Sequence, residues 1–258
     1  MAEVLGNLLG NRDITPFSVK KVDEGNMERR LPVIILVDTS GSMQGTETML
    51  QQSVKDLYRT LRNDPIACPR VELSVMSFNS DLQILEPMRE LEQHEAMGSN
   101  LAFRCEGCTY TGLALKMSIM HLEDRLKVFR EHRPRIRYYS PILFLLSDGK
   151  PECYDNAVIP EEQRAMSEAR AYIKKNVAER KLSVIAVEIG NGCDHDLMRD
   201  LTGLNDDKHV AKVSDKFQLA AVFKFTSTLI SYSSRNTHVD INNVDVKSFQ
   251  QEECKDGR

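Results

Sequence analysis

The sequence predicts an α/β fold: a doubly wound, mostly parallel six-stranded sheet with one antiparallel edge strand and helices on both faces. Three observations predict it. Continuous runs of β-branched and leucine residues are typical of strands that are buried on both faces of a parallel sheet. These runs alternate along the chain with longer segments of helical periodicity, as in sheets whose strands are joined by helical crossovers. Two of the strand-like segments are separated only by a short polar turn, which indicates a hairpin at one edge of the sheet.

The first half of the chain begins with a buried strand, whose apolar run lies between Arg30 and a turn rich in serine and glycine. A helix follows, because Val54, Leu57 and Leu61 recur near helical spacing. The sequence Asn63-Asp64-Pro65 ends it. The hairpin and a second helix complete this half. In order, the expected elements are the strand Pro32–Val37, the helix Thr46–Arg62, the strands Val71–Phe78 and Leu82–Leu85, and the helix Leu113–Val128.

The second half repeats the alternation of strands and helices. Two further apolar runs predict buried strands, and a charged, alanine-containing segment between them predicts a helix. Two more helices flank a short last strand. In order, these elements are Pro141–Leu146, Glu161–Val177, Leu182–Ile189, Asp194–Leu201, His209–Val213 and Ser214–Ser231.

The chain is expected to contain one large folded domain with a polar segment at each end. Its 258 residues suit one domain better than two. Residues 1–30 are mixed and charge-rich and are interpreted as an N-terminal arm, and residues 31–232 form the domain. Residues 233–258 are polar and aperiodic, which predicts a frayed C-terminal extension.

Composition excludes several classes of protein. The 34 Lys and Arg residues stand against 38 Asp and Glu residues, so the net charge of −4 argues against a protein that coats nucleic acid. The longest apolar run, Val33–Val37, is far shorter than the roughly 20 residues that a membrane-spanning helix needs. Met1–Asp13 carries no secretory pattern, so we expect a cytoplasmic protein with reduced thiols and no membrane insertion.

The first buried strand ends in Asp38-Thr39-Ser40-Gly41-Ser42. This loop lies at the carboxyl edge of the predicted sheet, where open α/β folds bind ligands. A carboxylate and two hydroxyls converge on it, and all three are hard oxygen donors of the kind that Mg²⁺ takes.

Two other segments bring oxygen atoms to the same edge. Thr109 lies in the sequence Gly-Cys-Thr-Tyr-Thr-Gly, just before a predicted helix. Asp148 follows another buried strand in the sequence Leu-Leu-Ser-Asp-Gly. The alternative for the first loop alone is that it caps a helix, since serine and aspartate are good capping residues. Three such segments in order, each beside its predicted strand or helix, favour a metal site.

Together the three segments resemble the metal-ion-dependent adhesion site (MIDAS) of the von Willebrand factor A domain family, over about residues 31–231. The resemblance implies that one divalent cation, Mg²⁺ or else Mn²⁺ or Ca²⁺, is held by five residues. The hydroxyls would bind directly and the carboxylates mostly through water. The positions that match are Asp38, Ser40, Ser42, Thr109 and Asp148. The family usually has glycine where this chain has Glu188, which places an additional carboxylate near this edge.

The resemblance also implies a function. In this family the ion docks an Asp or Glu of a partner protein, which makes the contact metal-dependent and needs no catalysis. The Asp-Thr-Ser-Gly-Ser-Met start is similar to that of bacterial TerY-type proteins of tellurium-resistance and stress operons. Such proteins are linked to phosphatases and kinases, so the expected setting is a stress-response or phospho-signalling assembly.

Two other functions stay open at this point. The first is a metal-dependent hydrolase, such as a phosphatase, that uses the same ion. It would need a general base near the open coordination position, and among nearby residues only Glu47, Glu188 and His195 qualify by type. The second is a purely structural subunit whose metal is incidental.

Under the docking hypothesis, the rim of the contact with the partner protein is expected to include the polar loop residues Gln44, Glu47 and Lys150.

Four of the six cysteines fall at the predicted metal edge of the sheet. A single C-x-x-C pair is a weak zinc signal, so unpaired thiols are the favoured interpretation and a zinc site is a minor alternative. The four are Cys105, Cys108, Cys153 and Cys193.

The segment Arg125–Arg137 is strongly basic, with Glu131 as the opposing charge. Because it connects a helix to the next strand, it should lie at the edge opposite the metal. We expect a solvated loop, and the alternative is a docking patch for an acidic or phosphorylated partner.

Overall fold

Six strands form a mixed sheet in the computed structural model, which describes residues 25–93, 101–213, 219–235 and 241–247. The β2–β3 pair is antiparallel, and every other neighbouring pair is parallel. The predicted fold class is therefore confirmed. Across the sheet the strands are β3 (Leu82–Glu90), β2 (Val71–Phe78), β1 (Leu31–Asp38), β4 (Ile142–Ser147), β5 (Ser183–Ile189) and β6 (Val210–Val213).

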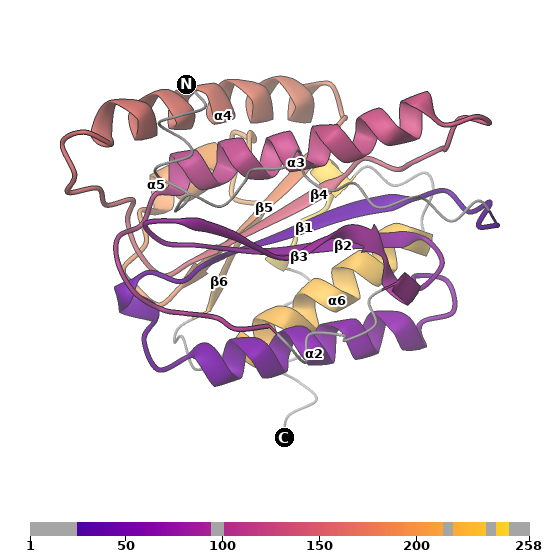
Figure 1. Cartoon of the computed structure of the whole chain (residues 1–258), viewed down its shortest axis with the longest axis horizontal. Coiled ribbons are helices and arrows are strands. Elements are labelled where there is room, and N and C mark those ends of the chain that lie inside the picture. The colour runs from indigo at the N-terminus through magenta and orange to yellow at the C-terminus, as the bar shows by residue number, and fades with distance from the viewer. Residues whose placement is uncertain (1–24, 94–100, 214–218, 236–240, 248–258) are drawn as a thin grey trace.

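Helices cover both faces of this sheet (Figure 1). Alternate residues of β1 point to opposite faces, so Val33 and Ile35 pack with α2 and α6, whereas Ile34 and Leu36 pack with α3, α4 and α5. This is why β1 is apolar from Leu31 to Val37. The helices are α2 (Glu47–Asn63), α3 (Thr111–Glu131), α4 (Ile159–Ala178), α5 (His195–Leu201) and α6 (Leu219–Arg235), with 3₁₀ turns at Gly41–Met43, Leu91–Gln93 and Ile241–Asn243.

The edge strand β3 is longer than the predicted segment Leu82–Leu85. Its second half contains charged residues, which broke the apolar pattern. These charges are accommodated by pairing: Arg89 Nη2 lies 2.6 Å from Glu86 Oε2, and Glu90 accepts from Arg30.

The polar segment after Ser233 was predicted to be frayed or an extension, and residues 241–247 are not frayed. Ile241 and Val246 are buried in the core beside α6. The Ile241 carbonyl lies 2.8 Å from His209 Nε2, and the Val246 amide donates to the Lys208 carbonyl at 2.8 Å. The few apolar residues of this polar segment carry no periodicity, so the sequence pattern did not predict this contact.

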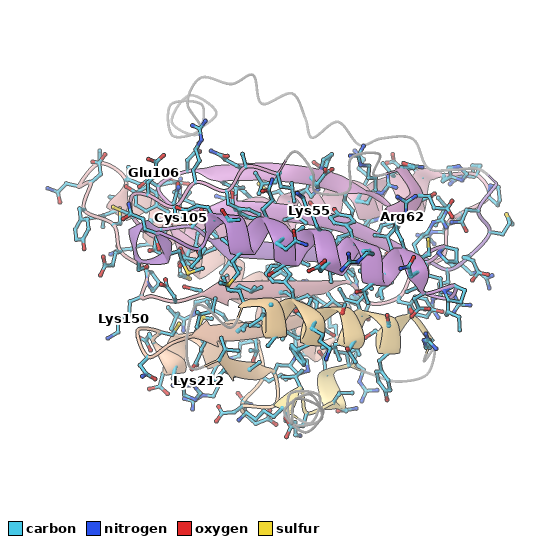
Figure 2. All side chains as sticks on the ribbon, turned by 90° about the horizontal axis from the view of Figure 1, so that it is seen from below. Lys55, Arg62, Cys105, Glu106, Lys150 and Lys212 are labelled. Atoms are coloured by element: carbon cyan, nitrogen blue, oxygen red, sulfur yellow. The ribbon has the colours of Figure 1, made fainter. Side chains whose placement is uncertain are left out.

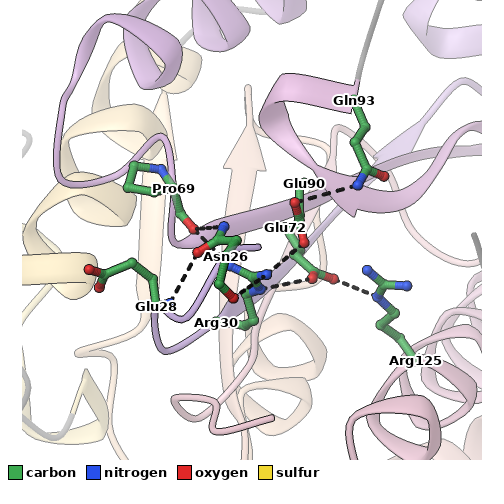
Figure 3. A network of polar contacts seen from close by, with 8 residues as sticks. All are labelled: Asn26, Glu28, Arg30, Pro69, Glu72, Glu90, Gln93 and Arg125. Carbon is green, nitrogen blue, oxygen red and sulfur yellow. Dashed lines mark hydrogen bonds and ion pairs between the residues drawn. The ribbon is translucent and has the colours of Figure 1, made fainter. Parts of the chain in front are cut away.

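A buried ion network closes the amino-terminal end of β1, away from the predicted metal loop (Figure 3). Arg30 Nη2 lies 2.7 Å from Glu90 Oε1, and Arg125 Nε lies 2.5 Å from Glu72 Oε2. Arg30 Nε also lies 3.6 Å from Glu72 Oε1. Arg125 is therefore a buried structural residue, which corrects its assignment to a solvated basic loop. The network joins β1, β2, β3 and α3.

Among the residues that the structure describes, no helix is both long and apolar enough to cross a membrane.

Candidate metal centre

Four of the five predicted ligands lie together at the carboxyl edge of the sheet. Ser42 Oγ donates to Asp148 Oδ1 at 2.7 Å and lies 3.1 Å from Ser40 Oγ. Asp38 ends β1 and accepts a hydrogen bond from the Ser40 amide at 2.8 Å. The first loop and the segment after β4 therefore bring two carboxylates and two hydroxyls into one continuous set of contacts.

Asp38 is fully buried beneath this loop. Its second carboxylate oxygen accepts from Ser147 Oγ at 2.6 Å. Burial raises the pKa of Asp38 above its usual value, the hydrogen bonds from Ser147 and Ser40 partly offset the rise, and the charge of Asp148 adds to it. Ser147 was not among the residues predicted from the sequence, although its place in the Leu-Leu-Ser-Asp-Gly segment could have indicated it.

The fifth predicted ligand, Thr109, lies on an adjacent loop. The Gly41 amide donates to the Gly107 carbonyl at 3.1 Å, and the Glu106 amide donates to the Thr39 carbonyl at 2.9 Å. Gly107 has a φ of +73°, a conformation that favours glycine. Thr109 is buried, and within the described part of the chain it hydrogen-bonds through its backbone and shares no hydrogen bond with the other four.

The Thr109 loop is fixed by the start of α3, which docks closely on α4. Glu162 of α4 accepts hydrogen bonds from the amides of Gly112 and Leu113, at 2.5 and 2.8 Å. The carboxylate therefore caps α3 from a neighbouring helix and complements the positive end of its dipole. A Cβ on Gly112 would lie 2.6 Å from the Glu162 carbonyl oxygen and 2.7 Å from the Met166 amide, so only glycine permits this approach. Sequence analysis did not predict Glu162, because this contact joins segments about 50 residues apart.

The donor set fits a divalent cation such as Mg²⁺. Carboxylates and hydroxyls are hard oxygen ligands. Among the described residues, no Lys, Arg or His forms an ion pair with Asp38 or Asp148, so two neighbouring carboxylates, one of them fully buried, lack a compensating charge. A cation would relieve this imbalance.

The other polar residues expected near this edge have separate roles. Glu188 is buried and lies 2.6 Å from His195 Nδ1, and this pairing raises the pKa of His195. Glu47 accepts a hydrogen bond from the Gly45 amide at 3.0 Å. Gln44 and Lys150 are exposed, and Figure 2 shows Lys150 projecting outward at the same end of the molecule as Cys105 and Glu106.

The four cysteines proposed as a zinc site do not converge. Cys105 packs in the core on the α2 side of the sheet, and Cys193 packs on the α3 side, with its thiol 2.9 Å from the Ser147 carbonyl oxygen. Cys108 and Cys153 share a third cluster. Across the described ranges, no group of three or more His, Cys, Asp and Glu side chains could hold a metal ion, so the minor alternative of a zinc site is not supported.

The basic segment after α3 lines a cavity of about 430 Å³ at the opposite edge of the sheet. Arg133, Arg135 and Arg137 are exposed there, and none forms an ion pair with a residue that the structure describes. Arg133 Nη1 instead donates to carbonyl oxygens at the end of α3, the nearest at 2.9 Å. The Arg137 carbonyl accepts from the Arg30 amide, which places this segment at the start of β1.

Comparison with known proteins relates the whole sheet to one family. The model for the von Willebrand factor type A domain matches residues 33–225. No curated protein matches the chain.

Several solved structures share the fold at low sequence identity. A mussel protein, proximal thread matrix protein 1 with a zinc-occupied MIDAS motif, is 18% identical with a TM-score of 0.55, over 80% of this chain and 49% of that one. The manganese-loaded TRAP protein of Plasmodium vivax is 19% identical with a TM-score of 0.51, over 75% of this chain and 72% of that one. A von Willebrand factor type A protein from Catenulispora acidiphila is 14% identical with a TM-score of 0.54, over 80% of this chain and 43% of that one. The chain thus spans about half the length of the mussel protein.

Proposed function

The chain belongs to the von Willebrand factor type A domain family, and from that membership and the site's geometry we propose that it is a metal-dependent protein-interaction module. One observation carries the proposal. Asp38, Ser40, Ser42 and Asp148 form one connected set of oxygen donors at the carboxyl edge of the sheet, and among the described residues no Lys, Arg or His forms an ion pair with either carboxylate.

Each residue of the site has a distinct role in the proposal. Ser40 and Ser42 present hydroxyls from a loop that is held in place by the Asp38 carboxylate. Asp148 orients Ser42 from the neighbouring strand end. Thr109 adds a third hydroxyl from the loop that packs against the first one. When bound, a divalent cation supplies an open coordination position for one anionic oxygen of a partner.

The partner we propose is a protein that contributes an Asp or Glu side chain. Neutral hydroxyls leave most of the charge of a bound cation uncompensated, so an anionic oxygen is the preferred remaining ligand. Mg²⁺ is the proposed ion. Among the structural neighbours, the mussel protein is described with zinc and the Plasmodium vivax protein with manganese, which supports a divalent ion in general.

The proposal also includes a cellular setting. The resemblance of the first loop to TerY-type proteins supports a cytoplasmic bacterial assembly of the stress-response or tellurium-resistance type, with a phosphatase or kinase as the partner. We propose no enzymatic activity. Both ring nitrogens of His195 face carboxylates, Glu188 at 2.6 Å and Asp207 at 3.4 Å, and Glu47 accepts from the Gly45 amide, so their present contacts do not favour the hydrolase alternative.

The test combines metal titration with partner capture. We expect the purified protein to bind one equivalent of Mg²⁺ by calorimetry, and Asp38→Ala to abolish the signal. In native extract, partners should be lost with EDTA, return with added Mg²⁺, and be absent with Asp38→Ala.

A matched control changes the opposite edge. The triple variant Arg133→Glu, Arg135→Glu, Arg137→Glu should leave both readouts unchanged, because these residues lie at the other end of β1. Unchanged capture with EDTA would reject metal-mediated docking. Loss of capture in the triple variant alone would move the interface to the basic cavity.

A further inference from the structure

Two cysteines lie on the two loops that flank the candidate metal centre. Cys108 precedes Thr109, and Cys153 follows Asp148 by five residues. The loops are joined by an isolated antiparallel bridge between Thr109 and Glu152. The bridge has both hydrogen bonds: each residue's amide donates to the other's carbonyl at 3.1 Å. The bridge therefore fixes the register of the two loops.

That register makes Cys108 and Cys153 direct neighbours. In an antiparallel pairing, the residue before one partner faces the residue after the other. Thr109 and Glu152 form a hydrogen-bonded pair. In a regular antiparallel ladder the pair next to such a pair is of the non-hydrogen-bonded type, whose Cα atoms lie about 4.5 Å apart. A disulfide requires Cα atoms about 4.4–6.8 Å apart. Facing residues also project to the same side of the pairing.

The side-chain environment agrees with this register. Both cysteines are free, partly buried thiols that pack against one small cluster containing Tyr110 and Val158. The other described cysteines are separated from this pair: Cys105 and Cys193 pack against opposite faces of the sheet, and Cys68 lies near Glu92.

We propose that Cys108 and Cys153 form a reversible intramolecular disulfide that ties the Thr109 loop to the segment after Asp148. The two thiols lose two protons and two electrons as the S–S bond forms. The oxidant is hydrogen peroxide, which is reduced to two water molecules, an alkyl hydroperoxide, which is reduced to an alcohol and water, or glutathione disulfide, which is reduced to two glutathione thiols. Transient redox-sensing disulfides of this kind occur in reducing compartments.

The consequence is local, because the new bond lies beside the existing bridge. It holds the Thr109 and Glu152 amides in their present hydrogen bonds and limits the opening of one ligand-bearing loop from the other. This last step rests on the proposed function, whereas formation of the disulfide does not.

The experiment uses the full chain without metal, in glutathione buffers of increasing oxidised fraction. Remaining thiols are alkylated, and cross-linked peptides are mapped by mass spectrometry. We expect an internal link between Cys108 and Cys153, reversed by dithiothreitol. We also expect the amides of Thr109 and Glu152 to exchange hydrogen at least tenfold more slowly in the oxidised protein.

Three variants sharpen the test. Cys108→Ser and Cys153→Ser should each lose the internal link, and the remaining thiol of the pair should form only mixed disulfides. Cys68→Ser is the matched control and should behave as the wild type. Alkylation of both Cys108 and Cys153 under the most oxidising buffer, or a link from either one to another cysteine, would overturn the proposal. Neither readout involves metal, so failure here and failure of metal-dependent docking are distinguishable.

Discussion

At the scale of single residues, one hydroxyl holds the two halves of the candidate metal centre together. Ser42 lies between Ser40 of its own loop and Asp148 of the next strand end. Its side chain is exposed, unlike that of Ser40, so it contributes little to the core. Its contribution to binding and its contribution to stability should therefore be separable.

We predict that Ser42→Ala lowers the affinity for Mg²⁺ about 10- to 100-fold, because it removes one proposed ligand and the hydrogen bond that orients Asp148. The free energy of unfolding should change by less than about 0.5 kcal/mol, since the residue is exposed. Calorimetric titration and urea unfolding measure the two quantities. Gln44→Ala, an exposed neighbour, should change neither, and equal Mg²⁺ affinities of the two variants would contradict the assignment of Ser42.

A second residue makes stability depend on pH. His121 is buried on α3, and its Nε2 accepts the Met88 amide of β3 at 3.1 Å. Burial and then the charge of Arg125 lower the pKa of His121 from 6.5 to about 4. Between these two values the unfolded chain binds more protons than the folded chain. The stabilisation is therefore complete above about pH 6.5 and is lost as the pH falls toward 4.

From pH 7 to pH 5, this single group should remove about 2 kcal/mol of unfolding free energy. His121→Gln keeps a hydrogen-bond acceptor but does not titrate, so its stability should fall by about 2 kcal/mol less than that of the wild type over the same range. Urea unfolding at the two pH values gives the comparison. Parallel pH profiles for the two proteins would show that His121 is not the responsible group.

At the scale of elements, α3 connects the metal edge to the rest of the fold. Its first turn follows the Thr109 loop and is capped by Glu162, its middle contacts β3 through His121, and its last third reaches the buried network through Arg125. A displacement at the start of α3 should therefore disturb both stability and the Thr109 loop.

We predict that Gly112→Ala destabilises the protein by about 1–3 kcal/mol, because the added Cβ would lie 2.6 Å from a backbone oxygen of α4. Mg²⁺ affinity should also fall, since α3 and the Thr109 loop must shift together. Gly149→Ala is a suitable control for stability, because its Cβ would meet no atom closer than 3.9 Å. Thermal or urea unfolding of both variants decides the matter, and equal stabilities would refute the close-packing argument.

The sequence predicted those elements whose patterns are local. The strand Val71–Phe78 agrees with β2 at both ends, and the apolar run of β1 identified a strand covered on both faces. The second half of β3 was missed, because its charged residues break the apolar pattern and Glu90 is paired with Arg30, which lies 60 residues earlier in the chain. The buried segment around Ile241 was missed because its apolar residues carry no periodicity.

The candidate site was likewise predicted only in the parts that have local sequence patterns. The oxygen-rich segments were recognisable because each motif is short and lies beside a predictable strand or helix. The placement of Ser147 against Asp38, of Glu162 under α3 and of Cys108 beside Cys153 depends on register between distant segments. No local pattern encodes such register, so these contacts required the structure.

At the scale of the whole molecule, the two ends of β1 have different tasks. The carboxyl end carries the candidate metal centre, and the amino end carries the buried ion network. β1 has eight residues, so the two lie about 26 Å apart. Changes in the network should therefore alter stability without altering the metal site.

We predict that Glu72→Ala lowers the free energy of unfolding by about 3–5 kcal/mol, because Arg30 and Arg125 stay buried while the carboxylate that pairs with both of them is removed. Mg²⁺ affinity, measured where the variant is folded, should be unchanged. Asp56→Ala breaks an exposed pair with Arg59 and should cost no more than about 1 kcal/mol. A variant at Glu72 that is as stable as the one at Asp56 would argue against a structural role for the network.

The central position of β1 also bears on how the protein is made. In the described part of the chain β1 is the first strand of the sheet, yet it needs β2 on one side and β4 on the other, and β4 begins at Ile142. Until the ribosome has released β4, one edge of a strand that is apolar from Leu31 to Val37 has no native partner. Nascent chains shorter than this should therefore depend on chaperones, and fragments ending before β4 should accumulate as insoluble material, even though every motif of the first loop is already present in them.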